Sequence, residues 1–206
     1  MQIGRLTFFL SIFFVSGWAN ASGNPDAGQA QALVCSACHG MDGATGLDDT
    51  YPNLAGQNER YLFEQLKMIQ SNERQILQMM GQLYGKTEDD LRDLAAYYSS
   101  LPAKLGVSSG DDDSIRLAER IYRGGLASKG IAACSACHAP DGRGNGPAGF
   151  PALGGQRVAY TITQLTAYRE NQRRSDESHG GMMRGVAGGL NDGEIAALAD
   201  YVHGLR

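Results

Sequence analysis

The hydrophobic positions along this chain recur with the spacing of amphipathic helices. Within residues 60–71, Leu62, Leu66 and Ile69 fall on one helical face, and residues 158–170 are the counterpart of this segment later in the chain. The intervening segments are rich in glycine and proline, and no segment alternates apolar and polar residues well enough to indicate a sheet. We therefore predict an all-α fold.

Two of the expected helices begin with the same pair of capping signals. Thr87 is followed three positions later by Asp90, and Asn191 is followed by Glu194 at the same spacing. In such a pair the first side chain accepts a hydrogen bond from the third helical residue, whose acidic side chain reaches back to the cap. The apolar stripe that follows the first signal consists of Leu91, Leu94, Ala95 and Tyr98.

Two further helices have single candidate caps. Asp26 is placed to cap a helix that runs into Cys35, and Ser114 is placed to cap a helix from Ile115 to Arg123. Short polar side chains at such positions accept hydrogen bonds from the free N–H groups of the first turn. The three aspartates at residues 111–113 are expected to end a solvated linker and to start this second helix.

The sequence is a tandem repeat. Residues 35–39 (CSACH) recur unchanged at residues 134–138, which is an offset of 99. After Arg74 and Arg173 the second copy gains five residues, so the offset becomes 104. Each copy is then a domain of fewer than 100 residues, which by itself buries little apolar surface. The first offset also matches residues 52–57 (PNLAGQ) to residues 151–156 (PALGGQ).

The repeat and the composition between its copies define the expected domains. We place the first domain at residues 22–103 and the second at residues 113–206, with a short linker at residues 104–112. The linker region is rich in glycine, serine and aspartate, which favour irregular structure.

The first 21 residues have the three parts of a secretory signal peptide. Arg5 supplies the positive charge, residues 6–18 form a short apolar stretch, and Ala19-Asn20-Ala21 fits a cleavage site after Ala21. A retained membrane anchor is the alternative, although the apolar stretch is short for a span of about 20 residues. The sequence therefore predicts export to the periplasm.

The charge of the chain excludes one class of partner. The formal net charge is −4, and it becomes −5 when the segment that contains Arg5 is removed. A mildly acidic chain argues against binding of nucleic acid. It favours protein partners that present basic docking faces.

The two copies of Cys-x-x-Cys-His use all the cysteines of the chain: Cys35, Cys38, Cys134 and Cys137. This motif is typical of covalent attachment of c-type haem, in which two thioethers hold the porphyrin and the histidine ligates the iron. His39 and His138 are the expected proximal ligands. Disulfides, a four-cysteine zinc site and a thioredoxin-like dithiol are alternatives, but none explains a histidine after each pair. Two copies predict two haem c groups.

The repeat also selects candidates for the opposite axial ligand of each iron. The thioether of methionine suits haem iron and raises its potential. At the offset of 104, Met79 matches Met183, and this is the one methionine pair that is equivalent in both copies. Both precede the last helix of their repeat, on an expected loop. The rival ligands are Met80, Met182, His179 and His203; we expect the two histidines at surface positions.

Other residues are candidates to support the haem. A ligating imidazole usually donates its second N–H to an acceptor, and the carbonyls of Pro52 and Pro151 are suited to this role. Hydrogen bonds to the haem propionates are one expectation for the side chains of Gln57, Tyr61, Gln156 and Tyr160. Helix packing explains the two tyrosines equally well.

These motifs resemble those of the dihaem cytochrome c4 family, over nearly all of the chain after residue 21. The resemblance rests on CSACHG with PNLAGQNERYL, on MMG before the last helix, on CSACHAPDGRGN with FPALGGQ, and on MMRGVAGGLND. It implies two tandem class I cytochrome c domains, each wrapped around one covalent haem, related by a pseudo-twofold axis with the propionate edges facing each other. It also implies His/Met ligation, by His39 with Met79 and by His138 with Met183.

The resemblance implies a periplasmic carrier of single electrons rather than an enzyme, so no catalytic residue is expected. The donor would be a quinol-oxidising cytochrome complex or a dehydrogenase, the acceptor a terminal oxidase, and the carrier would associate loosely with the membrane. The alternatives are the cytochrome subunit of a periplasmic dehydrogenase, such as a flavin-linked sulfide dehydrogenase, and a dihaem peroxidase. A peroxidase needs an iron with an open position, whereas His/Met ligation closes both.

Overall fold

The computed structural model of this protein describes residues 22–206. The predicted signal peptide at residues 1–21 lies outside the described residues. The described part of the chain is helical, with no strand beyond two isolated bridges, so the all-α prediction is confirmed. None of its helices is both long and apolar enough to cross a membrane.

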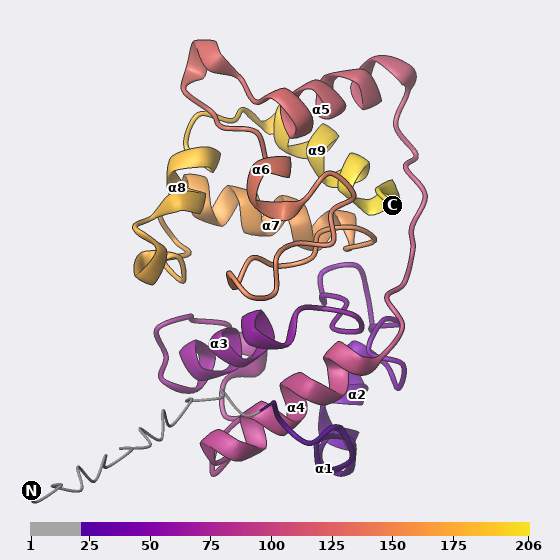
Figure 1. Cartoon of the computed structure of the whole chain (residues 1–206), viewed down its shortest axis with the longest axis vertical. Coiled ribbons are helices and arrows are strands. Elements are labelled where there is room, and N and C mark those ends of the chain that lie inside the picture. The colour runs from indigo at the N-terminus through magenta and orange to yellow at the C-terminus, as the bar shows by residue number, and fades with distance from the viewer. Residues whose placement is uncertain (1–21) are drawn as a thin grey trace, which may run out of the picture.

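The helices form two lobes, one above the other in Figure 1, and an extended segment along one side joins α4 to α5. The first lobe contains α1 (Pro25–Gln31), α2 (Leu33–His39), α3 (Glu59–Gln70), the 3-10 helix η1 (Leu77–Met79) and α4 (Glu88–Ser100). The second lobe contains α5 (Asp112–Gly124), η2 (Ala127–Lys129), α6 (Ser135–His138), α7 (Val158–Arg169), η3 (Glu177–His179), α8 (Met182–Ala187) and α9 (Asp192–Gly204).

Equivalent helices pack in the same way in both lobes. In the first lobe α4 packs against α1 and α3, and in the second α9 packs against α5 and α7. The helices predicted at residues 60–71 and 158–170 are α3 and α7, and their ends agree within one residue. The tandem repeat of the sequence is therefore a tandem repeat of structure.

The contact between α1 and α4 depends on Gly28. A Cβ atom at this position would lie 2.0 Å from the backbone oxygen of Asp93. Only glycine allows the two helices to approach this closely, because any side chain would collide with the backbone of α4.

Each lobe has a core of its own. In the first lobe the predicted stripe of α4 is buried, and Leu94, Ala95 and Tyr98 pack with Leu62 of α3. In the second lobe, α5, α7 and α9 bring their apolar faces together around a larger cluster. Its members with the lowest exposure include Ala118, Ile121, Tyr122, Ala187 and Ile195.

Both predicted capping boxes form. The Thr87 hydroxyl accepts from the backbone N–H of Asp90 at 3.1 Å, and the Asp90 carboxylate accepts from the N–H of Thr87 at 2.7 Å. Asn191 and Glu194 make the same reciprocal pair, at 2.9 Å in each direction. Four N–H groups that have no partner within the helix are thereby satisfied.

The two single-residue cap predictions are wrong. α1 is capped by Asn24, whose side-chain oxygen accepts from the N–H of Asp26 at 3.0 Å. α5 is capped by Asp111, whose carboxylate accepts from the N–H of Ser114 at 2.8 Å. Asp26 and Ser114 therefore lie inside the first turns, and their N–H groups are among those that the caps satisfy.

The linker is extended and lies against α9. The backbone N–H groups of Ser109 and Gly110 donate to the carboxylate of Asp200, at 2.8 and 3.0 Å. Gly106 is so close to His203 that a Cβ atom there would lie 2.4 Å from the imidazole ring. The linker is therefore fixed to the second lobe.

Candidate haem sites

The four cysteines lie at or near two short helices, α2 and α6, and all are free and half-buried. Residues three apart on a helix share one face, so each pair presents its thiols together, and the adjacent histidine ends the helix. Burial raises the pKa of the Cys35 thiol, and it raises that of Cys134 to about 11. The disulfide alternative does not form within residues 22–206, and these residues contain no cluster of three or more His, Cys, Asp or Glu that could hold a metal ion.

The histidine of each motif is buried and fixed by a proline carbonyl. Nδ1 of His39 lies 3.1 Å from the oxygen of Pro52, and Nδ1 of His138 lies 2.9 Å from the oxygen of Pro151. Burial lowers the pKa of both imidazoles, which favours the neutral form that ligates metals. These contacts hold each ring through Nδ1 and leave Nε2 for an iron atom.

The methionines selected by the repeat differ in exposure from their neighbours. Met79, at the end of η1, is half-buried, whereas the side chain of Met80 is 66% exposed. Met183 is half-buried against the core of the second lobe, whereas Met182 is 43% exposed. One detail of the prediction is wrong, because Met183 lies in the short helix α8 rather than on a loop.

The two rival histidines are partly exposed, so neither is fully open to solvent nor fully buried. His179 is half-buried, and its ring lies 6.2 Å from the ring of Phe150. His203 is half-buried beside the linker, and its Nδ1 lies 2.9 Å from the backbone oxygen of Gln156. Both rings therefore have packing roles in the second lobe.

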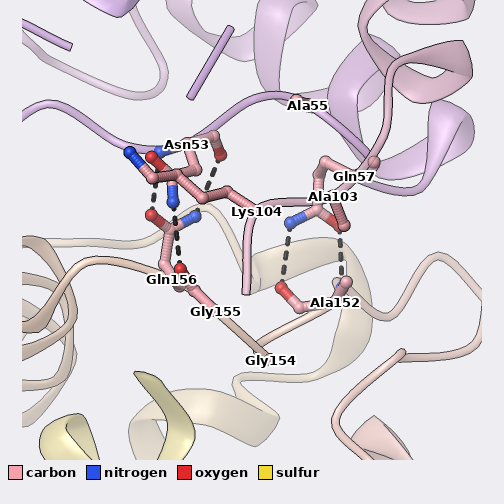
Figure 2. A pocket seen from close by; sticks show the side chains of 10 residues that line it. Asn53, Ala55, Gln57, Ala103, Lys104, Ala152, Gly154, Gly155 and Gln156 are labelled. Carbon is pink, nitrogen blue, oxygen red and sulfur yellow. Dashed lines mark hydrogen bonds between the residues drawn. The ribbon is translucent and has the colours of Figure 1, made fainter. Parts of the chain in front are cut away.

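A reciprocal clamp of glutamines joins the lobes. Gln57 donates to the backbone oxygen of Ala152 at 2.9 Å and accepts from its N–H at 2.7 Å. Gln156 makes the equivalent pair with Asn53, donating at 3.0 Å and accepting at 2.8 Å. Figure 2 shows the two pairs side by side across the interface. Both glutamines use their amides on the opposite lobe, so the structure does not support their expected role toward propionates.

The hydroxyl groups of Tyr61 and Tyr160 also have protein partners. Each accepts a hydrogen bond from an arginine of the opposite lobe, Arg173 and Arg74 respectively. No motif in the sequence predicts a role for these two arginines. Their equivalence in the repeat and their place on either side of one interface are the signals that could have drawn attention to them.

These residues fit covalent haem. Each lobe presents two free thiols on one helical face, followed by a buried imidazole whose Nδ1 is already occupied. A haem held there supplies an iron that alternates between the ferric and ferrous states. The chain's own contribution is to attach it through the cysteines, to fix the imidazole and to exclude water.

Two helical lobes with one such site each define a tandem c-type cytochrome with two covalent haem c groups. The family model for cytochrome c matches residues 25–102 and again residues 127–206. Cytochrome c4 of Stutzerimonas stutzeri is 43% identical over 201 residues, covering 93% of this chain and 94% of that protein. The chain belongs to the cytochrome c4 family.

Two further comparisons bear on fold and partners. The crystal structure of reduced recombinant cytochrome c4 from Pseudomonas stutzeri matches with a TM-score of 0.85 and 42% identity, covering 90% of this chain and all of that one. A thiosulfate dehydrogenase electron acceptor of Thiomonas intermedia is 35% identical, covering 85% of this chain and 80% of that protein. The protein is therefore an electron-transfer cytochrome and not an enzyme.

Proposed function

We propose that this protein carries single electrons in the periplasm between complexes of a respiratory chain, toward a terminal oxidase. The observation that carries the proposal is its similarity to cytochrome c4 over 93% of its length, with both haem motifs intact. Its donor would be a quinol-oxidising cytochrome complex or a dehydrogenase. The acidic net charge favours docking to basic faces of such partners.

The proposal includes a ligand set for each iron. His39 with Met79 and His138 with Met183 are the proposed axial ligands, and the carbonyls of Pro52 and Pro151 fix the imidazoles. The half-burial of the chosen methionines, beside more exposed neighbours, supports this set. Closed coordination suits a carrier, because neither iron then offers a position to a substrate.

Export is part of the proposal. The proposed mature chain begins at Ser22, and covalent haem would protect its cysteines in an oxidising compartment. N-terminal sequencing of the protein purified from periplasm should begin at Ser22. A chain that retains residues 1–21 and sediments with membranes would contradict this part.

A second candidate is an electron acceptor dedicated to one dehydrogenase. The 35% identity to a thiosulfate dehydrogenase electron acceptor favours this candidate over a peroxidase. In that case the protein would bind its dehydrogenase permanently or receive electrons from it alone. The candidate partners are then a flavin-linked sulfide dehydrogenase, which the family resemblance implies, and a thiosulfate dehydrogenase, which the similarity to its electron acceptor adds.

Gentle purification of the native protein from periplasm and membranes distinguishes the two candidates. A carrier should elute without a stoichiometric partner, and in its reduced form it should be reoxidised rapidly by membranes that contain terminal oxidase. Inhibition of the oxidase should stop that reaction. A dehydrogenase that co-purifies in equal amount, together with no oxidation by membranes, would contradict the carrier role.

A further inference from the structure

The exposed apolar side chains of this protein are concentrated in the first lobe. Within residues 22–206, ten large apolar side chains are exposed: seven in that lobe, two in the linker and one in the second lobe. The seven, which we call the first-lobe patch, are Leu33, Val34, Met41, Leu47, Leu77, Met80 and Tyr84. Single exposed apolar residues are ordinary, whereas a group of them gathered on one part of a surface marks an interaction site.

The members of the first-lobe patch lie around α2. The first two are in the first turn of this helix, and the third follows its end. The backbone N–H of Leu47 donates to the oxygen of Cys38, in α2, at 2.9 Å. Just before the helix, the side chain of Gln31 accepts from Lys86 at 2.7 Å, so the segment of residues 77–86 is held beside the start of α2. The seven side chains therefore belong to one region of the lobe.

The second lobe has no equivalent of this patch. The offsets of 99 and 104 match the seven positions to Ala132, Ala133, Pro140, Gly146, Gly181, Arg184 and Gly188. Four of these residues are exposed and three are half-buried, so these positions also reach the surface. A position that packs against a haem should be apolar in both lobes, because each lobe has one haem site. A contact that only the first lobe makes therefore explains the seven residues better than packing against the cofactor does.

The two lobes also differ in charge. Residues 22–103 contain eleven Asp and Glu against five Lys and Arg, a net charge of −6, whereas residues 113–206 contain nine against eleven, a net charge of +2. Exposed carboxylates adjoin the first-lobe patch, since Asp42 follows Met41 and Asp48 follows Leu47. An apolar area bordered by carboxylates complements a protein face that has an apolar centre bordered by Lys and Arg. An anionic lipid surface would repel it.

We propose that the first-lobe patch is the docking face for one redox partner, a protein that presents an apolar centre bordered by Lys and Arg, and that the second lobe makes no such contact. In the function proposed above this partner is the terminal oxidase, so electrons leave the protein through the first lobe. The inference rests on that proposed function, and it adds the lobe and the residues that dock.

Oxidation of the reduced holoprotein by membranes that contain terminal oxidase tests this docking face. Leu33→Lys and Ala132→Lys add the same charge at equivalent exposed positions of the two lobes, so they have the same effect on net charge. Leu33→Lys should lower the second-order rate constant about tenfold at low ionic strength, because it places a cation opposite a basic face. Ala132→Lys should change the rate constant less than about twofold.

A second set of variants removes apolar surface without adding charge. The double variant Leu33→Ser with Leu47→Ser should lower the rate constant by about tenfold, and this ratio should not depend on ionic strength. Val107→Ser is the matched control, because Val107 is 72% exposed but lies in the linker, outside the patch. It should leave the rate constant unchanged. All these variants should hold two haems at unchanged potentials, which separates docking from haem binding.

The oxidation rates separate the docking face from the proposed function. Rapid oxidation of the wild type, Leu33→Lys and the double serine variant alike would overturn the docking face and leave the proposed function standing. An equal fall for Leu33→Lys and Ala132→Lys would also overturn it, since net charge alone would then set the rate. If the membranes did not oxidise even the wild type, the proposed function would be contradicted, and the oxidase with it as the occupant.

Two further measurements exclude other occupants of the first-lobe patch. Vesicles of phosphatidylglycerol and phosphatidylethanolamine should not bind the wild type, and sedimentation velocity should show a monomer. Vesicle binding that the double serine variant loses would assign the patch to lipid. A dimer that the same variant dissociates would assign it to a second copy of this chain. Either result would overturn the inference.

Discussion

At the scale of single residues, the informative comparison is between adjacent methionines. Met79 and Met80 have the same chemistry, and only the repeat distinguishes them, because the counterpart of Met80 is Arg184. In the structure the Arg184 side chain is held by Asp176, at 2.8 Å, as part of the second lobe. The five extra residues of the second copy therefore change the surroundings of Met183. Met183 is still the equivalent of Met79 in the repeat, at the offset of 104.

We predict that Met79→Ala removes one axial ligand and Met80→Ala does not. The first variant should lose the methionine-to-ferric-iron charge-transfer band of one haem, lower that haem's potential and bind carbon monoxide at one iron per chain. Met183→Ala and its control Met182→Ala should behave in the same way at the second haem. Optical and carbon monoxide titrations of the holoprotein provide the measurement. If Met80→Ala alone abolished ligation, the register of the first repeat would be misplaced.

The residues of the haem sites could be predicted because their chemistry is local. A Cys-x-x-Cys-His motif contains both thioethers and one iron ligand within five residues, and the supporting proline lies only 13 residues later in each copy. The contacts that Arg74 and Arg173 make with the opposite lobe could not be predicted in this way. The repeat shows that the two arginines are equivalent, but it does not show which residues of the opposite lobe they meet.

At the scale of elements, the errors concern where helices begin. Asn24 and Asp26 are both good caps, but Pro25 between them decides the question, since proline favours the first helical position and so makes its predecessor the cap. At α5 four polar residues in a row offer four possible starts. There the outcome depends on the linker, because contacts of Ser109 and Gly110 with Asp200 fix the chain just before Asp111.

Substitution of the caps should separate the observed from the predicted helix starts. Asp111→Ala removes the side chain that accepts from the N–H of Ser114, so it should lower the free energy of unfolding by about 1 kcal/mol. Ser114→Ala keeps that N–H and should change stability much less. Denaturant unfolding of the holoprotein provides the measurement. Equal losses for the two variants would show that the cap is misassigned.

At the scale of the whole molecule, the sequence shows that the two halves are alike but not how they dock. The repeat predicts equal lobes, and the cores and capping boxes follow from it. The clamp of Gln57 and Gln156 is a contact between lobes, so no periodicity within one copy indicates it. Its reciprocity is nevertheless what a pseudo-twofold arrangement requires, since equivalent residues make equivalent contacts.

The linker contacts predict a pH-dependent difference between two fragments of the second lobe. Residues 104–206 should be more stable than residues 111–206, because both fragments keep the Asp111 cap and only the longer one retains the donors from Ser109 and Gly110 to Asp200. Burial raises the pKa of Asp200, but these hydrogen bonds outweigh it and the net pKa is lowered. The stabilisation is therefore present above the ordinary aspartate pKa of about 3.9 and lost as the pH falls below it.

Thermal unfolding of both haem-loaded fragments from pH 7 to pH 3 tests this prediction. The difference between their midpoints should shrink as the pH falls below about 4. A constant difference over this range would mean that Asp200 is not the group that holds the linker. A failure of both fragments to retain haem would instead show that the interface between the lobes is essential to the fold.

The central claim is that this chain carries two haems, each closed by its own lobe, and functions only in electron transfer. Coulometric titration of the purified holoprotein under carbon monoxide, near neutral pH, tests it most directly. The account predicts reversible uptake of two electrons per chain, one for each cytochrome c domain, at potentials that carbon monoxide does not change. Uptake of one electron per chain, or a carbon monoxide-dependent shift of either potential, would contradict it.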